Sequence, residues 1–133
     1  MRVVLDTNIF ISALIFPGGK AEEAVMRIIE GEHALVISHE IIDEVLTVLA
    51  RKFSKDAEAL SRAAVNLATL GELVRPVERL NILDDKADNR LLECAVAGNA
   101  AVIVTGDKAM LMLRKYRDIR ILSLSEFLRK GKG

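Results

Sequence analysis

Two acidic residues follow hydrophobic segments at positions where a carboxylate could do chemistry. Asp6 ends the apolar stretch 1–6, and Asp107 lies two residues beyond the apolar stretch 101–105. Where strands run parallel in an α/β sheet, functional groups gather at the carboxyl ends of the strands. Both acids could instead cap the helices that follow them, because aspartate is a favoured N-cap residue.

A third acid, Asp88, is harder to explain as a surface residue. On a predicted helix over 86–97 it shares a face with Leu91 and Leu92. A lone ionised carboxylate on such a face costs several kcal/mol or takes up a proton, so it needs a metal ion or a hydrogen-bond network. The alternative is a reciprocal cap, in which Asp85 begins the helix and Asp88 reaches back to its start.

The fourth acid is Glu44, in a predicted helix over 38–51. It falls at the edge of the apolar stripe, near Val48, whereas Asp43 points away. Glu44 can therefore lean inward, although a solvated position is the alternative. Four acids from four elements form one site only if cations neutralise them, and oxygen ligands fit Mg²⁺ or Mn²⁺ rather than zinc or copper.

Histidine and cysteine add nothing to this set. His33 precedes a predicted strand and His39 follows a cap residue, and both are interpreted as surface residues because no ligand cluster surrounds them. Cys94 falls towards the flank of its helix, which indicates a small, partly buried residue. A single cysteine forms neither an internal disulfide nor a thiolate metal site, which favours a reducing compartment.

Composition restricts the class of protein. The chain has 133 residues, 51% of them hydrophobic, which suits one domain with a substantial core. Nineteen basic residues balance nineteen acidic ones, so a nucleic-acid contact must come from a local patch. Aromatic residues make up 4%, which argues against base-stacking folds of the OB or RRM kind. No signal peptide or membrane span is visible, and we expect a soluble cytoplasmic protein.

Predicted strands alternate with predicted helices. The strands are expected at 1–6, 34–37, 73–74, 101–105 and 119–122, and the helices at 7–15, 21–31, 38–51, 57–70, 86–97, 108–115 and from Ser123 or Ser125 onward. This order predicts an α/β sandwich around a mostly parallel sheet. No boundary divides the chain, so one domain over 1–133 is expected, with 129–133 as a frayed basic tail.

Four motifs in this order resemble a known family. They are Asp6-Thr7-Asn8 after the first strand, Glu44 within residues 40–46, Asp88 within residues 85–95, and Val104-Thr105-Gly106-Asp107-Lys108. Together they resemble the PIN-domain family over essentially the whole chain, and more narrowly its small stand-alone VapC-like toxins of toxin–antitoxin pairs.

The resemblance implies a three-layer α/β/α fold with a five-stranded, mostly parallel sheet and a Mg²⁺- or Mn²⁺-dependent endoribonuclease. The residues that match the family's catalytic, metal-binding acids are Asp6, Glu44, Asp88 and Asp107. The residues that match supporting positions are Asn8, which steadies the first acid, Thr105, whose hydroxyl precedes the last, and Asp85, an ancillary acid. Hydrolysis would then use a metal-activated water without a covalent intermediate.

Contacts to RNA phosphates are expected in the second half of the chain. Residues 67–133 hold twelve basic and nine acidic residues, and from Lys108 onward eight bases face two acids. The candidates for phosphate contacts are Lys86, Arg90, Lys108 and Arg114, each of which could equally be a solvated surface residue.

The leading hypothesis is a ribonuclease toxin inhibited by an antitoxin that covers the acidic site. A catalytically silent RNA-binding or scaffold protein is the alternative. A phosphoacceptor domain is disfavoured, because such domains need adjacent acids after the first strand and Asp6 is followed by Thr7-Asn8. A homodimer is expected from the resemblance, with the helix over 57–70 supplying either an interface or ordinary core.

Overall fold

A six-stranded sheet forms the centre of the computed structural model, which describes residues 1–53 and 56–130. Its strands are β1 (Arg2–Leu5), β2 (Ala34–Ser38), β3 (Glu72–Val74), β4 (Val102–Val104), β5 (Lys115–Tyr116) and β6 (Ile119–Leu122). Their spatial order is β3-β2-β1-β4-β6-β5, and every neighbouring pair is parallel except β5 and β6. The mostly parallel sheet predicted from the alternation is confirmed.

The expectation of five strands was wrong by one. The additional strand, β5, pairs antiparallel with β6 through Lys115 and Arg120. The sequence pattern had extended a helix over 108–115, but that helix ends at Leu113. The chain turns there because Arg114 adopts a φ of +61°, which is incompatible with a right-handed helix.

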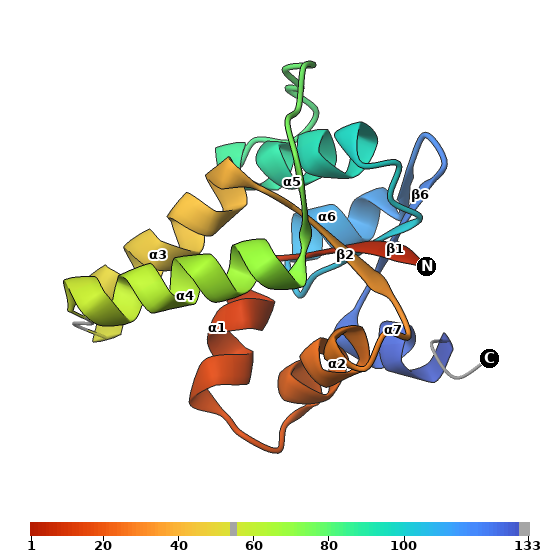
Figure 1. The fold of residues 1–133 in the computed structure, drawn as a ribbon. Helices are drawn as coiled ribbons and strands as arrows, with labels where there is room; N and C mark the ends of the chain where they lie inside the picture. The colour runs from red at the N-terminus through yellow and green to blue at the C-terminus, as the bar shows by residue number, and fades with distance from the viewer. Residues whose placement is uncertain (54–55, 131–133) are drawn as a thin grey trace.

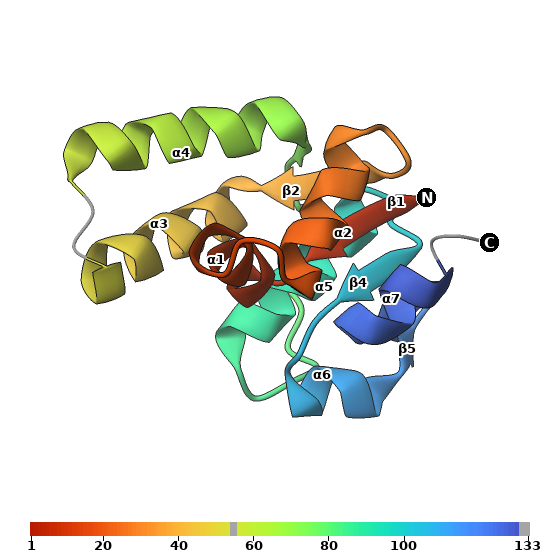
Figure 2. The same ribbon diagram turned by 90° about the horizontal axis from the view of Figure 1, so that it is seen from below.

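Helices cover both faces of the sheet and complete the predicted three layers. They are α1 (Thr7–Ile15), α2 (Lys20–Ile29), α3 (His39–Phe53), α4 (Ala57–Leu70), α5 (Lys86–Ala97), α6 (Lys108–Leu113) and α7 (Leu124–Lys130). In Figure 1, α5 lies on one side of the sheet and α1, α2 and α7 lie on the other. Viewed from below in Figure 2, α3 and α4 run side by side and extend beyond the sheet.

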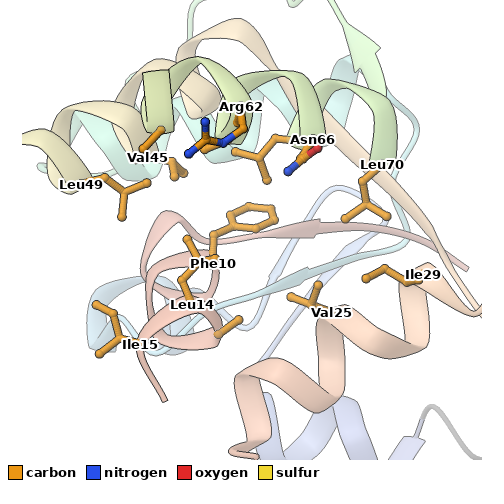
Figure 3. A pocket seen from close by; sticks show the side chains of 14 residues that line it. Phe10, Leu14, Ile15, Val25, Ile29, Val45, Leu49, Arg62, Asn66 and Leu70 are labelled. Atoms are coloured by element: carbon orange, nitrogen blue, oxygen red, sulfur yellow. The ribbon is translucent and has the colours of Figure 1, made fainter. Parts of the chain in front are cut away.

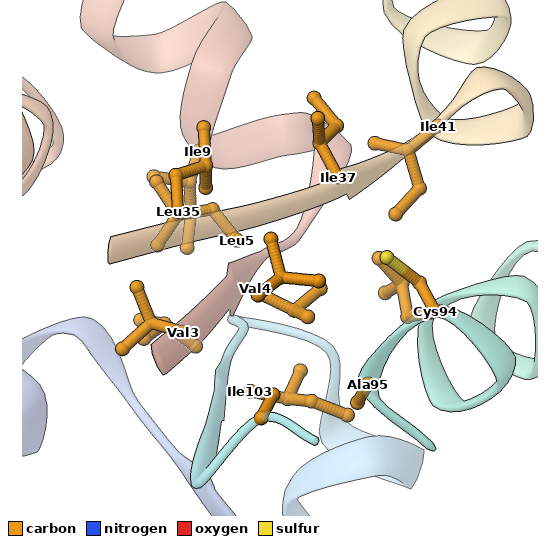
Figure 4. Packing of buried hydrophobic residues seen from close by; sticks show 14 of the residues in the cluster. Val3, Val4, Leu5, Ile9, Leu35, Ile37, Ile41, Cys94, Ala95 and Ile103 are labelled. Atoms are coloured by element: carbon orange, nitrogen blue, oxygen red, sulfur yellow. The ribbon is translucent and has the colours of Figure 1, made fainter. Parts of the chain in front are cut away.

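The core is built around the central strand β1. Val3, Val4 and Leu5 are at most 1% exposed. Successive side chains of a strand point to opposite faces, and Figure 4 shows Val4 directed towards Ala95 of α5 while Leu5 lies beside Leu35 and the helix α1. A strand covered on both faces explains the unbroken apolar run at the start of the sequence.

Two predictions about burial were wrong. His33 is buried rather than exposed, because its ring packs 5.0 Å from the ring of Phe127 and its Nδ1 lies 3.2 Å from the amino group of Met1. Cys94 is fully buried, and this burial raises the pKa of its thiol to about 12. His39 is exposed as predicted.

The last helix changes the interpretation of the C-terminal tail. Ser123 begins α7 by accepting a hydrogen bond from the backbone N–H of Glu126, while the Glu126 side chain accepts one from the Ser123 backbone N–H. This reciprocal cap stabilises the first turn. Of the predicted tail over 129–133, Arg129 and Lys130 lie within α7, and residues 131–133 lie outside the described residues.

Within the described ranges, no helix combines the length and the apolar character needed to span a membrane.

Candidate active site

Thr105 links the acids that follow the two central strands. β1 and β4 are parallel neighbours, so Asp6 and Asp107 emerge at the same edge of the sheet. The fully buried Thr105 hydroxyl donates a hydrogen bond of 2.6 Å to Oδ2 of Asp6 and accepts one of 3.0 Å from the backbone N–H of Asp107. One side chain thus contacts both the carboxylate of Asp6 and the backbone of Asp107.

Both acids also cap helices, as the alternative interpretation of the sequence predicted, and capping leaves their position at the sheet edge unchanged. Oδ1 of Asp6 accepts from the backbone N–H of Asn8 at 3.2 Å, and Oδ2 of Asp107 accepts from the backbone N–H of Met110 at 3.0 Å. Asn8 therefore steadies Asp6 through its main chain, and its own side chain is exposed. These bonds fix the two carboxylates against the backbone.

Glu44 leans towards the same edge from α3. It is half-buried, whereas its neighbour Asp43 is exposed, as the helical spacing predicts. Oε2 of Glu44 accepts a hydrogen bond of 3.2 Å from the hydroxyl of Thr7. Burial raises the pKa of Glu44 above its ordinary value, the Thr7 bond opposes this, and the charges of Asp6 and Asp85 raise it further.

Thr7 was not recognised from the sequence as a site residue. Its side chain is 3% exposed, although it directly follows Asp6 at the start of a helix. The sequence does show a hydroxyl residue directly after an acid, but the hydrogen-bond partner, Glu44, lies 37 residues away in the chain. Only the packing of α1 against α3 brings the two side chains together.

Asp88 is the most deeply buried of the four acids, at 4% exposure. Burial is the largest of the causes that raise its pKa to about 7, followed by a hydrogen bond with Asp107 and by the charges of Asp107, Asp85 and Asp6. In the described part of the chain, its Oδ2 has no hydrogen-bond partner. A buried carboxyl oxygen without a donor is energetically costly unless a proton or a cation compensates it.

The reciprocal cap considered for Asp88 does not form in the described structure. Asp85 begins α5 alone, by accepting a hydrogen bond of 2.8 Å from the backbone N–H of Ala87. The carboxyl of Asp88 instead faces the acids at the sheet edge. We refer to the carboxyl groups that influence one another there as the acidic cluster: Asp6, Glu44, Asp85, Asp88 and Asp107.

The donor set of the acidic cluster suits a hard cation such as Mg²⁺, because every ligand is an oxygen. The unpartnered oxygen of Asp88 points to the same chemistry. Across residues 1–53 and 56–130, however, no three His, Cys, Asp or Glu side chains are already arranged so that they could hold a metal ion. Metal binding therefore requires carboxylates of the cluster to turn towards a common point.

Asn89 fixes the chain that leads into the cluster. Its Oδ1 accepts from the backbone N–H groups of Ile82 and Leu83, at 3.0 and 2.9 Å, and its Nδ2 donates to the carbonyl of Leu83 at 2.7 Å. The side chain is 2% exposed. Sequence reasoning missed this role, because a polar residue beside Asp88 gives no sign of the loop it binds.

Glu93 anchors the same segment one helical turn later. At 2% exposure, it accepts from the backbone N–H of Leu80 at 2.8 Å and pairs with Arg79 and Arg90 at 3.1 and 3.2 Å. Arg90 was predicted to contact substrate phosphate, yet it is already paired with a buried carboxylate. The Arg90 side chain is therefore held by Glu93 on its own helix, α5. Asn89 and Glu93 in turn hold the loop that precedes Asp85.

The other three predicted phosphate contacts are exposed, and none of them has an ion pair within the described ranges. Lys86 lies in the first turn of α5. Lys108 and Arg114 line one depression of about 390 Å³ together with Leu111 and Met112, which we call the α6 hollow. In the chain, Lys108 directly follows Asp107, an acid of the cluster.

A larger cavity of about 660 Å³ lies elsewhere and is apolar. Figure 3 shows side chains of α1 and α2 facing those of α3 and α4 across it. We call it the apolar groove, and its lining residues are Phe10, Ala13, Leu14, Ile15, Val25, Ile29, Val45, Leu49, Ala59, Arg62, Ala63, Asn66, Leu67 and Leu70. No member of the acidic cluster lines it, so the two regions are separate.

The fold and the cluster define a small α/β protein with an all-carboxylate site at the carboxyl edge of a parallel sheet. The family model described as a PIN domain matches residues 2–109, and the chain belongs to the PIN domain family. A curated relative, the uncharacterized protein MJ1680 of Methanocaldococcus jannaschii, is 30% identical over 131 residues, covering 93% of this chain and 84% of the relative.

Two solved structures share the fold. VapBC2 from Rickettsia felis, bound to a DNA fragment from its promoter, superposes with a TM-score of 0.65 at 15% identity, covering 92% of this chain and 98% of that chain. VapBC-1 from nontypeable Haemophilus influenzae gives a TM-score of 0.65 at 17% identity, covering 94% and 99%. The layered fold predicted from the sequence is thus that of known structures.

Proposed function

We propose that this protein is a Mg²⁺- or Mn²⁺-dependent endoribonuclease that hydrolyses RNA phosphodiesters at Asp6, Glu44, Asp88 and Asp107. The observation that carries the proposal is the buried oxygen of Asp88, which lacks a donor among neighbouring carboxylates. Such a cluster repels an anionic substrate unless cations neutralise it. Membership of the PIN domain family supports the same activity.

The residues of the cluster have distinct tasks in this proposal. Asp6, Glu44, Asp88 and Asp107 would hold a divalent ion, whose chemistry when bound would be to activate a water as nucleophile and to offset charge on the leaving oxygen. Thr105 keeps Asp6 and Asp107 at a fixed separation, and Thr7 orients Glu44. No histidine lies within the cluster as described, which leaves the carboxylates to take up and release protons.

We further propose that the protein acts in the cytoplasm as the toxin of a toxin–antitoxin pair. The likeness of its fold to VapBC2 and VapBC-1 motivates this idea. A cognate antitoxin protein is then its partner, and by covering the acidic cluster it would keep RNA away. The homodimer predicted from the sequence belongs to the same proposal, because no described side chain of α4 is fully buried within one chain.

The decisive experiment is RNA cleavage by the purified protein. A mixed set of structured and single-stranded RNAs is incubated with Mg²⁺, with Mn²⁺ and with chelator. Asp6→Asn and Asp88→Asn remove charge from the cluster, and Asp43→Asn removes the same charge from an exposed position. We expect metal-dependent cleavage by the wild type and Asp43→Asn, and none by the two cluster variants.

Metal binding separates the nuclease from the silent scaffold. Isothermal titration with Mn²⁺ should show binding to the wild type that is weakened in Asp88→Asn. A folded wild type that binds RNA but neither binds Mn²⁺ nor cleaves would contradict the nuclease and support the scaffold. Metal-independent cleavage that persists in both cluster variants would show that the activity comes from a contaminant.

A further inference from the structure

The α6 hollow combines apolar and cationic side chains in one depression. Lys108, Leu111 and Met112 occupy positions i, i+3 and i+4 of α6, so they share one face of the helix. Arg114 follows the helix and completes the lining. Met112 is 82% exposed, whereas Leu111 is partly buried against the core, so the described chain leaves the Met112 side of the hollow open.

Its two cations are free to bind a ligand. Neither Lys108 nor Arg114 has a side-chain hydrogen bond or an ion pair in the described ranges, whereas Arg79, Arg90 and Arg117 are all paired with glutamates. The whole segment from residue 108 onward carries eight basic and two acidic residues. An anionic ligand is therefore favoured here, in contrast to the acidic cluster one residue away.

The backbone at Arg114 is unusual for a side-chain-bearing residue. Its φ of +61° and ψ of −42° form a combination that L-amino acids rarely adopt. Glycine would take this conformation with less strain, yet an arginine occupies the position. Backbone strain of this kind clusters at functional sites, where the side chain has a use that offsets it.

We propose that the α6 hollow is a nucleotide subsite that holds the RNA nucleotide next to the cleaved phosphodiester. A nucleotide joins a phosphate anion to a flat, largely apolar base, and the hollow offers both complementary surfaces. Lys108 and Arg114 contact phosphates flanking the base, while Leu111 and Met112 pack against the base itself. This inference rests on the proposed function, because it takes RNA as the substrate.

The test measures RNA binding by the full-length protein. A fluorescein-labelled, single-stranded 12-nucleotide RNA of mixed sequence serves as the probe, and fluorescence anisotropy is followed between roughly 50 and 300 mM salt with Mg²⁺ present. In the binding measurements Asp6→Asn is the background of every arm, so that the probe is not consumed, and for KM the same substitutions are made in the otherwise wild-type protein. Thermal melting of each variant checks that it is folded.

Removing both cations tests the phosphate contacts. The pair Lys108→Ala and Arg114→Gly should weaken binding about tenfold or more at low salt and reduce the slope of log K against log salt by about 1.4, since each single-strand phosphate contact contributes about 0.7. Glycine relieves the strained backbone, so this pair should fold. The matched control, Arg51→Ala with Lys52→Ala, removes two exposed cations at the far end of α3 and should leave the slope nearly unchanged.

Met112→Ser tests the contact with the base. It should weaken binding about threefold while leaving the salt slope unchanged, because no charge is lost. The exposed Val77, at 95%, provides the control Val77→Ser, which should have no effect. Equal losses in the hollow and control pairs would mean that the cations act only through overall charge, and would overturn the subsite.

Wild-type cleavage measured beside the binding separates this inference from the proposed function. If the wild type cleaves RNA and the hollow variants keep both affinity and KM, the subsite is wrong and the nuclease stands. If RNA binds through the hollow but the wild type never cleaves with either metal, the nuclease is wrong and the subsite stands. A protein that binds no RNA at low salt contradicts both.

Discussion

The acidic cluster and the apolar groove lie in one small protein, but opposite forces act in them. In the cluster, carboxylates are brought close together and partly buried, so repulsion and desolvation oppose the folded state. In the groove, apolar side chains of four helices face an open cavity, so these side chains lack van der Waals contacts on the cavity side. The first region should respond to metal, pH and salt, and the second should respond to none of them.

The buried hydrogen bonds explain how the cluster persists despite its repulsion. Asp6 and Asp107 are bound to Thr105 and to backbone N–H groups, and Glu44 is bound to Thr7. No comparable polar framework holds the groove, whose α4 side consists of partly exposed residues. Substitutions in the acidic cluster should therefore change different properties of the protein from substitutions in the groove, and this difference distinguishes the two regions.

The largest difference should appear in catalysis. Asp88→Asn should lower RNA cleavage by about a thousandfold or more, because under the proposed function it removes a charge that a bound metal ion would need. Leu67→Ala, in the groove, should leave the rate of cleavage within about twofold. Initial rates with Mg²⁺ at matched protein concentration measure both, and a groove variant as inactive as Asp88→Asn would show that the regions are not separate.

A smaller effect on activity is expected at Thr105, which supports two acids without itself being a ligand. Thr105→Val keeps the shape but removes the bonds to Asp6 and Asp107, and should reduce activity about 10- to 100-fold, as is typical for residues that orient metal ligands. Thr105→Ser restores the hydroxyl and should recover most of the rate. The wild type and the two variants are compared by kcat and by the Mg²⁺ concentration that gives the half-maximal rate. Equal values in all three proteins would show that the Thr105 hydroxyl does not support the acids.

The next largest difference between the acidic cluster and the apolar groove should be in how stability depends on pH. Without metal, the folded protein holds the Asp88 proton up to its pKa of about 7, whereas the unfolded chain loses it near the ordinary value of 3.8. At this site the folded state then binds more protons between these values, so the contribution of Asp88 to the free energy of unfolding falls as pH rises from about 4 to 7. Asp88→Asn should be more stable than wild type at pH 8 by on the order of 2 kcal/mol, with little advantage at pH 4.

Urea denaturation in chelator at pH 4.5, 6 and 8 measures this difference. Asp43→Asn is the control, because it removes the same charge from an exposed position on α3. Adding Mg²⁺ at pH 8 should stabilise the wild type and not Asp88→Asn, since a cation replaces the proton in compensating the carboxylate. A stability advantage of Asp88→Asn over the wild type that does not grow through this pH range would contradict the sign derived from Asp88.

The spacing of residues along the helices was enough to predict that Glu44 and Asp88 turn inward, although it did not identify Glu93, which is 2% exposed. Helical periodicity distinguished Glu44 from Asp43 and placed Asp88 on the buried face of α5, whose limits, Lys86–Ala97, agree with the pattern. The strands of the parallel sheet were likewise visible as short apolar runs. These features depend on neighbours within a few residues, which is the range over which a sequence pattern carries information.

Contacts between distant segments were not predictable in this way. The burial of His33 depends on Phe127 of α7, and the bond from Thr7 to Glu44 depends on the packing of two helices. The additional strand, β5, depends on the turn at Arg114, and arginine is not a residue type whose presence predicts a positive φ. Such features are set by tertiary structure, which overrides local preference.

The smallest effect should come from the groove itself. Leu67→Ala removes a partly buried side chain from α4, which packs mainly on α3, and should lower the free energy of unfolding by about 1 kcal/mol. Because no charge changes, the loss should be the same at pH 4.5 and pH 8, with and without Mg²⁺. Leu92→Ala, in the fully buried core, should cost about 2–5 kcal/mol under the same conditions. A Leu67→Ala loss that varied with pH or Mg²⁺ would mean that α4 is coupled to the acidic cluster through α3, and the distinction between the two regions would fail there.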